Sequence, residues 1–188
     1  MAKQARVLND AEIKRVIAAA KNTRHAERNE LMVLLSFNAM LRSCEIAALN
    51  VSDVLDGDGS VKQQIYLKKE QTKGNEAQVV YFNEKLRKAI AQYLKNRFKA
   101  GRLLKSQKTE GEGFKSKEIQ KIFYKLYKDA GIQNASSHSG RRTGITKLAS
   151  QGVAVSVIQR LARHAHLNTT QRYIEVSSDK LASAVQLI

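Results

Sequence analysis

The chain has 188 residues, with 33 Lys and Arg against 17 Asp and Glu, and its single cysteine excludes a disulfide framework and a cysteine-rich zinc site. Its hydrophobic content of 43% and charged content of 27% are typical of a globular protein with an ordinary core. No apolar run reaches the ~18–20 residues that a membrane span needs, and the first ten residues lack the apolar stretch of a signal peptide. We therefore expect a cytoplasmic protein without a membrane partner.

The strongest compositional feature is the net charge of +16. A charge this large destabilises a compact chain by self-repulsion and favours a polyanionic partner, of which nucleic acid is the default. Residues 85–128 carry 14 Lys and Arg against three Asp and Glu, and counterion release rewards such clustering when phosphates are bound. We expect DNA as the partner, with a ribosome-associated or merely very soluble protein as the alternative. Charge does not separate a protein that cuts DNA from one that reads or coats it.

Apolar spacing predicts a mainly helical protein interrupted by two short strands. A run at 61–67 alternates as a strand does, and a second strand is expected at 77–82, with turn clusters before each. Two such strands form a small antiparallel sheet, so the expected fold class is α+β, mainly α. The expected helices cover residues 10–23, 28–40, 41–49, 84–100, 116–129, 140–151, 155–163 and 178–188.

Three local details accompany these elements. Asn9 or Asp10 can cap the first helix, because a side-chain oxygen there can accept from the first helical N–H groups. Ser43 is expected to cap the short third helix, with Glu45 in its first turn. Residues 101–117 form the one loop that looks flexible.

Arg42 is the first candidate for chemistry, since it follows an apolar helix and sits among residues that otherwise belong to a core. A half-buried arginine needs an anionic partner, and Glu45 can supply one from within the chain. Two interpretations stay open. The pair either only holds two helices together, or it presents a guanidinium to an external anion.

A second cluster, HSGRRT, opens a helix with His138 three residues before Arg141. A helix N-terminus attracts phosphate through its unpaired N–H groups, and an arginine adds a planar fork that matches phosphate oxygens. The alternative is that His138 only caps the helix and the arginines are solvated.

The third cluster runs from residue 161 to residue 173 and ends at Tyr173, with His164 and Arg172 nearby. Residues 153–176 can be read as a helix-turn-helix, which would make a DNA reader without chemistry. A phenol is a weak nucleophile at neutral pH, but cationic and hydrogen-bonding neighbours would activate it. The plainer reading of Tyr173 is a core or interface tyrosine. Three histidines, at 138, 164 and 166, invite a metal site, but no carboxylate or cysteine stands at ligand spacing beside them.

Taken together, these segments resemble the catalytic domain of the tyrosine recombinase (phage integrase) family over residues 8–178. The first arginine box is similar to LRSCEIAALNVSDV, the second to HSGRRTGIT, and the last to RLARHAHLNTTQRYIEVS, while TKGNEAQVVYF is similar to the hairpin that bears the family's lysine. The resemblance places the catalytic residues at Tyr173, Arg42, Arg141, His138, His164 and Lys73, with Glu45 supporting Arg42.

The sequence departs from the family pattern at three places. Arg142 stands where many members carry a second histidine, and Ala162-Arg163 replaces the more frequent Leu-Gly before His164. No amino-terminal DNA-clamping domain is expected within residues 1–188, which we interpret as a single catalytic domain. Residues 178–188 form a helix that can dock on a neighbouring subunit through Leu181, Val185 and Ile188, or pack within its own chain.

The resemblance implies a site-specific DNA recombinase of the integrase or invertase type that needs no cofactor. Tyr173 would attack a DNA phosphate to form a 3′-phosphotyrosine link, and Arg42 and Arg141 would hold the non-bridging oxygens. His138 would act as acid and base, His164 would donate to a phosphate oxygen, and Lys73 would protonate the leaving 5′ oxygen.

The implied partners are double-stranded DNA, a homotetramer assembled on that DNA, and accessory DNA-bending proteins. The protein would then be nucleoid-associated when bound. The competing interpretations are a non-catalytic DNA-binding protein with a helix-turn-helix-like carboxy-terminal region, and a type IB topoisomerase.

Overall fold

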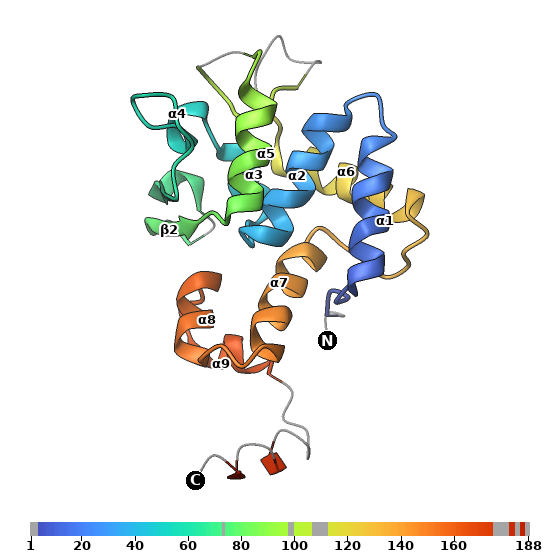
Figure 1. Ribbon diagram of the computed structural model, residues 1–188, viewed down its shortest axis with the longest axis vertical. Coiled ribbons are helices and arrows are strands. Elements are labelled where there is room, and N and C mark those ends of the chain that lie inside the picture. Colours follow the sequence, from blue (N-terminus) through green and yellow to red (C-terminus); the bar gives the residue numbers. More distant parts are fainter. Residues whose placement is uncertain are drawn as a thin grey trace. The chain divides into compact units, whose positions relative to one another are not determined.

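A computed structural model describes residues 4–72, 74–97, 100–106, 113–174, 181–182 and 185–186. The chain forms two compact units, Met1–Gly144 and Ile145–Ile188. The protein is mainly helical with one two-stranded sheet, as predicted (Figure 1). No helix of the described residues is both long enough and apolar enough to cross a membrane.

The first unit begins with two long helices, α1 (Asp10–Lys21) and α2 (Ala26–Asn38). Asn9 caps α1: its side chain accepts from the backbone N–H of Glu12, whose carboxylate accepts in turn from the backbone N–H of Asn9. Helix α2 is buried along most of its length and packs against α1 and α5 (Glu84–Leu94). It is therefore the central element of the core, and its end positions the residues that follow it.

Two short helices come next, α3 (Ser43–Ala48) and α4 (Val51–Val54). The expectation that Ser43 caps α3 is wrong, because the cap position is Arg42 and Ser43 is the first helical residue. The reason is the carboxylate of Glu45, which accepts a hydrogen bond from the backbone N–H of Arg42 at 2.8 Å and so starts the helix there. Helix α4 was not predicted.

The predicted sheet is confirmed as an antiparallel pair, β1 (Gln64–Leu67) and β2 (Gln78–Tyr81), with Ile65 opposite Val80. Ile65 and Leu67 are buried while Gln64 and Tyr66 are exposed, which is the alternation that the sequence shows. A short 3-10 turn, η1 (Lys69–Gln71), was not predicted and follows β1 directly.

Helix α6 (Ser116–Asp129) has the predicted bounds, whereas α5 ends at Leu94 instead of residue 100. Lys95 and Arg97 beyond that end are exposed and offer no apolar side chain to the core. Of the expected flexible loop at 101–117, the structure describes residues 101–106 and 113–117, and residues 103–106 are packed against the core side of the chain. Leu103 is fully buried and donates its backbone N–H to the carbonyl of Leu49 at 2.9 Å.

Helix α7 (Ser139–Ser150) starts in the first unit, where two glycines let it approach the end of α2. A Cβ at Gly140 would lie 2.4 Å from Oγ of Ser36, and one at Gly144 would lie 2.7 Å from the carbonyl oxygen of Phe37. Real Cβ atoms essentially never come so close to another heavy atom. Both glycines are therefore required by a close helix contact.

We expect Gly144→Ala to lower the free energy of unfolding by about 1–3 kcal/mol, the usual cost of overpacking a core. The added methyl would meet backbone, which cannot swing aside, and it would push α7 away from Phe37 and Met40. Urea unfolding of both proteins measures the effect. Gly57→Ala is the matched control, because nothing lies within 4 Å of a Cβ there. Equal stability of the two variants would contradict the close contact.

The second unit contains the rest of α7 together with α8 (Val155–Ala162) and α9 (Leu167–Gln171), which pack against each other. The predicted helix at 155–163 is confirmed to within one residue. It ends where Arg163 adopts a left-handed conformation, with φ of 56°, that turns the chain sharply before His164. The predicted helix at 178–188 lies largely outside the described residues. Leu181 and Val185 are described and exposed, and Ile188 is not described.

Candidate active site

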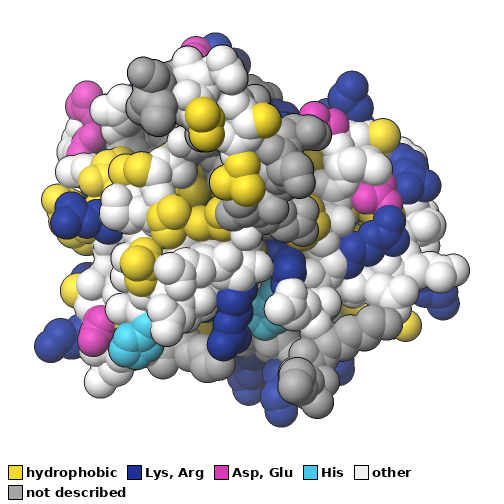
Figure 2. Space-filling view, turned by 90° about the horizontal axis from the view of Figure 1, so that it is seen from below, with side chains coloured by type: hydrophobic (Ala, Val, Ile, Leu, Met, Phe, Trp, Pro, Cys, Tyr) yellow, Lys and Arg dark blue, Asp and Glu magenta, His cyan; other side chains and the backbone are white. Residues whose placement is uncertain are grey.

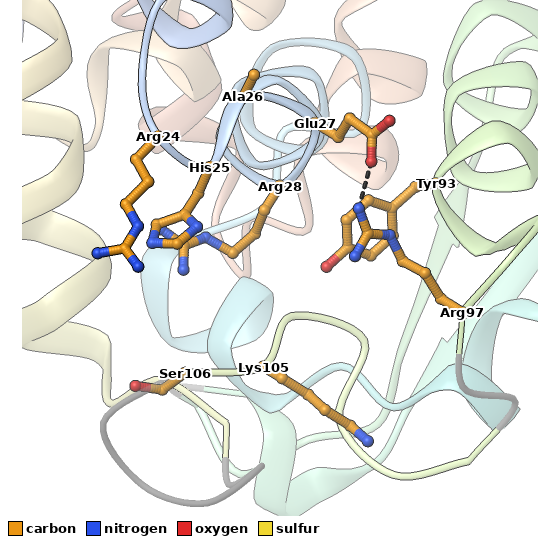
Figure 3. Close-up of a pocket in the computed structure, with 9 residues that line it drawn as sticks. All are labelled: Arg24, His25, Ala26, Glu27, Arg28, Tyr93, Arg97, Lys105 and Ser106. Atoms are coloured by element: carbon orange, nitrogen blue, oxygen red, sulfur yellow. Dashed lines mark hydrogen bonds and ion pairs between the residues drawn. The ribbon is translucent and has the colours of Figure 1, made fainter.

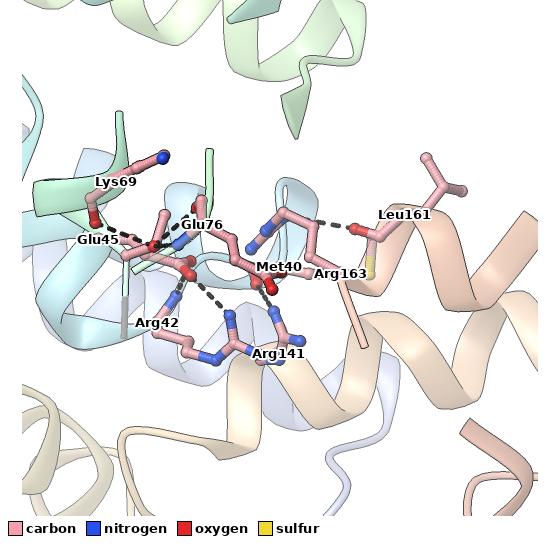
Figure 4. Close-up of polar contacts among 9 residues, drawn as sticks. Met40, Arg42, Glu45, Lys69, Glu76, Arg141, Leu161 and Arg163 are labelled. Atoms are coloured by element: carbon pink, nitrogen blue, oxygen red, sulfur yellow. Dashed lines mark hydrogen bonds and ion pairs between the residues drawn. The ribbon is translucent and has the colours of Figure 1, made fainter. Parts of the chain in front are cut away.

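Arg42 lies at the start of α3 and is fixed there by Glu45 (Figure 4). Its Nη1 lies 2.6 Å from Oε1 of Glu45, and the second carboxylate oxygen accepts from the Arg42 backbone N–H. Glu45 is fully buried, whereas the side chain of Arg42 is 24% exposed. The carboxylate thus anchors the guanidinium from the protein side and leaves part of it open to solvent.

Arg141, in the first turn of α7, is 95% buried, and its Nη1 donates to the carbonyl oxygen of Met40 at 2.6 Å. Met40 has a φ of +52°, a left-handed backbone conformation that residues other than glycine rarely adopt. The residue lies two positions before Arg42, so this bond ties the second arginine to the turn that carries the first. Figure 4 labels both arginines, with Arg42 bonded to Glu45 and Arg141 bonded to Met40.

His138 is exposed and immediately precedes α7. Its backbone carbonyl accepts a hydrogen bond from the backbone N–H of Arg142, in the first turn of the helix, at 2.9 Å. Its own backbone N–H donates to Oγ of Ser136 at 3.3 Å. His138 and Arg141 are three residues apart, which places them on the same side of the helix start. The first unit therefore ties Arg141 to the turn that carries Arg42 and Glu45, with His138 three residues before Arg141 in the sequence. That the four residues form one cradle stays a prediction.

The second unit brings His164 and Tyr173 together. Their rings are stacked, with centroids 5.7 Å apart and planes inclined by 21°. Nδ1 of His164 is hydrogen-bonded to Oγ1 of Thr170 at 2.9 Å, and Thr170 is fully buried in α9. The backbone N–H of Tyr173 also donates to the Thr170 carbonyl, so Thr170 contacts the His164 ring and the backbone of Tyr173.

Replacing Thr170 with Val is expected to lower the rate of the cleavage step that the family resemblance implies by up to about tenfold, the equivalent of one lost hydrogen bond. The isosteric side chain keeps the packing but leaves His164 free to rotate. Single-turnover cleavage kinetics with purified protein measure the change. Thr169→Val, one residue earlier, is the control, and a larger effect there would contradict a positioning role for Thr170.

The sixth predicted residue, Lys73, lies outside the described residues. The residues on either side form a turn in which the hydroxyl of Thr72 donates to the Glu76 carbonyl at 2.8 Å and accepts from the Glu76 backbone N–H at 3.2 Å. The turn follows η1 and leads into β2. The predicted role of Lys73 stays a prediction.

The predicted residues fall into two groups in different compact units, and their union in one site is a proposal. Sequence reasoning missed Met40 and Thr170, whose roles come from a backbone carbonyl and from a buried hydroxyl. No local pattern marks either residue. The pair Gly140 and Gly144, four apart on one helix face, was a usable signal for the close approach of α7.

In the part of the chain that the structure describes, no group of three His, Cys, Asp or Glu side chains could hold a metal ion.

Comparison with known proteins identifies the family that the sequence motifs resemble. Residues 6–180 match the model of the phage integrase family. The chain is 28% identical over 181 residues to the tyrosine recombinase XerA of Pyrococcus horikoshii, covering 95% of this chain and 60% of that protein. It thus spans well under two thirds of this curated relative.

Two solved structures share the fold. The crystal structure of XerA recombinase has a TM-score of 0.74 at 25% identity, covering 98% of this chain and 66% of that one. The Tn1549 transposon integrase in complex with transposon right end DNA has a TM-score of 0.76 at 15% identity, covering 98% of this chain and 66% of that one. Because the family model matches nearly the whole sequence, the chain belongs to the phage integrase family, the tyrosine recombinases.

Proposed function

We propose that this chain is the catalytic part of a site-specific DNA recombinase that cleaves and rejoins DNA through a 3′-phosphotyrosine intermediate. The observation that carries the proposal is the pair of anchored arginines, Arg42 and Arg141, in a chain whose second unit holds Tyr173 against His164. Such residues supply a nucleophile, hydrogen-bond donors and positive charge for phosphoryl transfer. A protein that only binds DNA needs none of these arrangements.

In the proposed cleavage step, the phenolic oxygen of Tyr173 attacks a backbone phosphorus, and the bond from phosphorus to the 5′ oxygen breaks. The phenol proton passes to a base, proposed to be His138, and the leaving 5′ oxygen takes a proton from Lys73. The phosphodiester is exchanged for a phosphotyrosine ester, so the reverse attack by a 5′-hydroxyl can rejoin the strand without an external energy source.

The arginines would stabilise the charge that grows on the two non-bridging oxygens in the five-coordinate transition state. A guanidinium fork suits two phosphate oxygens, and an arginine held by Glu45 or by a backbone carbonyl is already oriented before DNA binds. With the Thr170 hydroxyl donating to Nδ1, the Nε2–H of His164 would donate a further hydrogen bond to a phosphate oxygen.

Double-stranded DNA as the substrate is supported by the distribution of charge. The exposed side of α6 carries four lysines that can contact backbone phosphates, and the face drawn in Figure 2 shows more Lys and Arg side chains than Asp and Glu side chains. The lysines of α6 are Lys117, Lys121, Lys125 and Lys128. Lys125 has an acidic neighbour, Asp129, at 3.0 Å.

We also propose that four copies assemble on two DNA sites. Leu181 and Val185 are 58% and 62% exposed, so both are available to a neighbouring subunit. Accessory DNA-bending proteins would act on this assembly and not on the cleavage step.

The decisive experiment is a selection for covalent adducts, because the target site is unknown. The chain is incubated in EDTA with a library of nicked duplexes whose central sequence is randomised. Complexes that survive SDS are captured, digested and sequenced. We expect adducts enriched for one sequence, with protein joined to the 3′ phosphate of the cleaved strand.

Protein attached to a 5′ end would contradict the proposed polarity of attack. Retention of DNA that vanishes in SDS would favour the non-catalytic DNA-binding protein. Adducts formed equally on all sequences would favour a topoisomerase.

A further inference from the structure

The first unit contains a hollow of about 400 Å³ that the proposed active site does not use (Figure 3). It lies between the turn that joins α1 to α2, the end of α5 and residues 105–106. Five of its lining residues carry basic groups, against the single carboxylate of Glu27. These residues are Arg24, His25, Arg28, Arg97 and Lys105.

Arg28 is the most buried cation of this hollow. Its guanidinium lies 4.8 Å from the centre of the Phe114 ring, and its Nε and Nη2 donate to Oδ1 of Asn29 at 3.1 and 3.0 Å. Burial lowers the pKa of Arg28 from its usual value. Within the described ranges no carboxylate forms an ion pair with it, although half-buried cations usually have one. The site therefore holds an oriented cation whose charge an external anion would balance.

Arg97 is oriented in a similar way on the other side of the hollow. Its guanidinium lies 4.6 Å from the centre of the Tyr93 ring and forms an ion pair with Glu27. Stacking on rings removes much of the rotamer freedom that an arginine would lose on binding. Two guanidinium forks are therefore held in place before any ligand arrives.

Arg24 and His25 complete the basic wall. In Figure 3 their nitrogen-bearing ends gather with that of Arg28. Partial burial, and then the charges of Arg28 and Arg24, lower the pKa of His25. Mutual repulsion of this kind is relieved when an anion enters.

The hollow is separate from the catalytic arginines. Arg28 lies in the first turn of α2 and Arg42 follows its far end. From Arg28 to the end of α2 at Asn38 the helix rises about 15 Å at 1.5 Å per residue, and the two guanidinium groups are held on different partners, Phe114 and Glu45.

We propose that this hollow binds a phosphoryl group at a site distinct from the cradle of Arg42 and Arg141. Arginine forks match the tetrahedral arrangement of phosphate oxygens, and the net positive charge of the wall favours a dianion. The phosphoryl group can belong to a nucleic-acid backbone or to a free phosphorylated compound such as a nucleotide. The site does not depend on the recombinase reaction.

The test is a titration of the ¹⁵N-labelled chain with inorganic pyrophosphate at 0.15 M salt, observed at the backbone amides of Ala26 and Glu27. These amides report on the hollow and not on the catalytic arginines. We expect saturable shifts. The variant Arg24→Gln/Arg28→Gln is expected to raise the dissociation constant at least tenfold.

The control is Lys14→Gln/Lys85→Gln, which removes the same charge from exposed positions outside the hollow and is expected to change the constant less than twofold. Equal weakening in both double variants would mean diffuse attraction and would overturn the proposal. So would the absence of saturable shifts at Ala26 and Glu27 in the wild-type chain.

Two further arms keep the test interpretable. Arg24→Gln/His25→Gln leaves the contact of Arg28 with Phe114 intact, so it should weaken binding at least threefold even if the first variant is unstable.

Glu110 and Glu112 follow Ser106 in the sequence. If pyrophosphate binds only after Glu110→Gln/Glu112→Gln, the hollow serves an acidic segment of its own chain and the proposal fails.

Titration of the same amides with a short DNA duplex distinguishes the two sources. Shifts with both DNA and pyrophosphate would assign the site to a nucleic-acid backbone. Shifts with pyrophosphate alone would assign it to a free phosphorylated compound. Both results support a phosphoryl site.

Discussion

Replacing Tyr173 with Phe is expected to abolish the SDS-resistant protein–DNA adduct while leaving DNA affinity and thermal stability unchanged. The substitution removes only the phenolic oxygen, which is the proposed nucleophile. The ring remains, and so does its stacking on His164. A structural tyrosine would show the opposite result, with adduct formation retained.

The measurement is a suicide-substrate assay on the sequence obtained from the adduct selection, with binding followed by gel shift. Tyr124→Phe is the matched control, since Tyr124 is 67% exposed on α6 and has no proposed role in cleavage. Adduct formation by the Tyr173 variant at the wild-type rate would end the assignment of the nucleophile.

Arg42→Ala is expected to lower the cleavage rate by about 10²–10³, the usual cost of losing one donor to a developing negative charge. It should also lower the free energy of unfolding by about 3–5 kcal/mol, because it leaves the buried carboxylate of Glu45 without its cation. A single variant thus mixes a catalytic and a structural effect.

The double variant Arg42→Ala/Glu45→Gln separates the two effects. A neutral amide at position 45 can still accept the backbone N–H of residue 42 but no longer needs a cation. We expect it to recover at least half of the lost stability, measured by urea unfolding, and none of the lost cleavage. Recovery of both cleavage and stability would mean that the Arg42–Glu45 ion pair has only a structural role at the junction of α2 and α3.

Local patterns predicted most of the secondary structure because helices and strands depend on near neighbours. The apolar stripe of α6 and the alternation of β1 and β2 are examples, since each buried face is written directly in the spacing of its apolar residues. The helix ends were predicted less well. Helix α3 begins at a carboxylate that bonds back to Arg42, and α5 ends where exposed residues offer nothing to the core.

The candidate site was predicted from the kinds of residue and from family resemblance, and the structure shows two local arrangements among these residues. His164 and Tyr173 stack, and the two arginines are tied to the same turn. Placing Tyr173 at the arginine cradle stays a prediction, as does the role of Lys73, which lies outside the described residues.

The sequence by itself was enough to predict the fold class, a polyanionic partner from the net charge, and the residue types that phosphoryl transfer needs. Only the tertiary structure decided how these residues are held. Arg141 is bonded to a carbonyl 101 residues earlier in the chain, and Gly140 allows α7 to touch Ser36. The cations of the basic hollow likewise come from distant segments: the turn before α2, the first turn of α2, the residues after α5, and residue 105. The spacing of apolar residues shows which side of a helix or strand is buried. Contacts between segments far apart in the sequence depend on how whole helices and strands pack together, which only the tertiary structure shows.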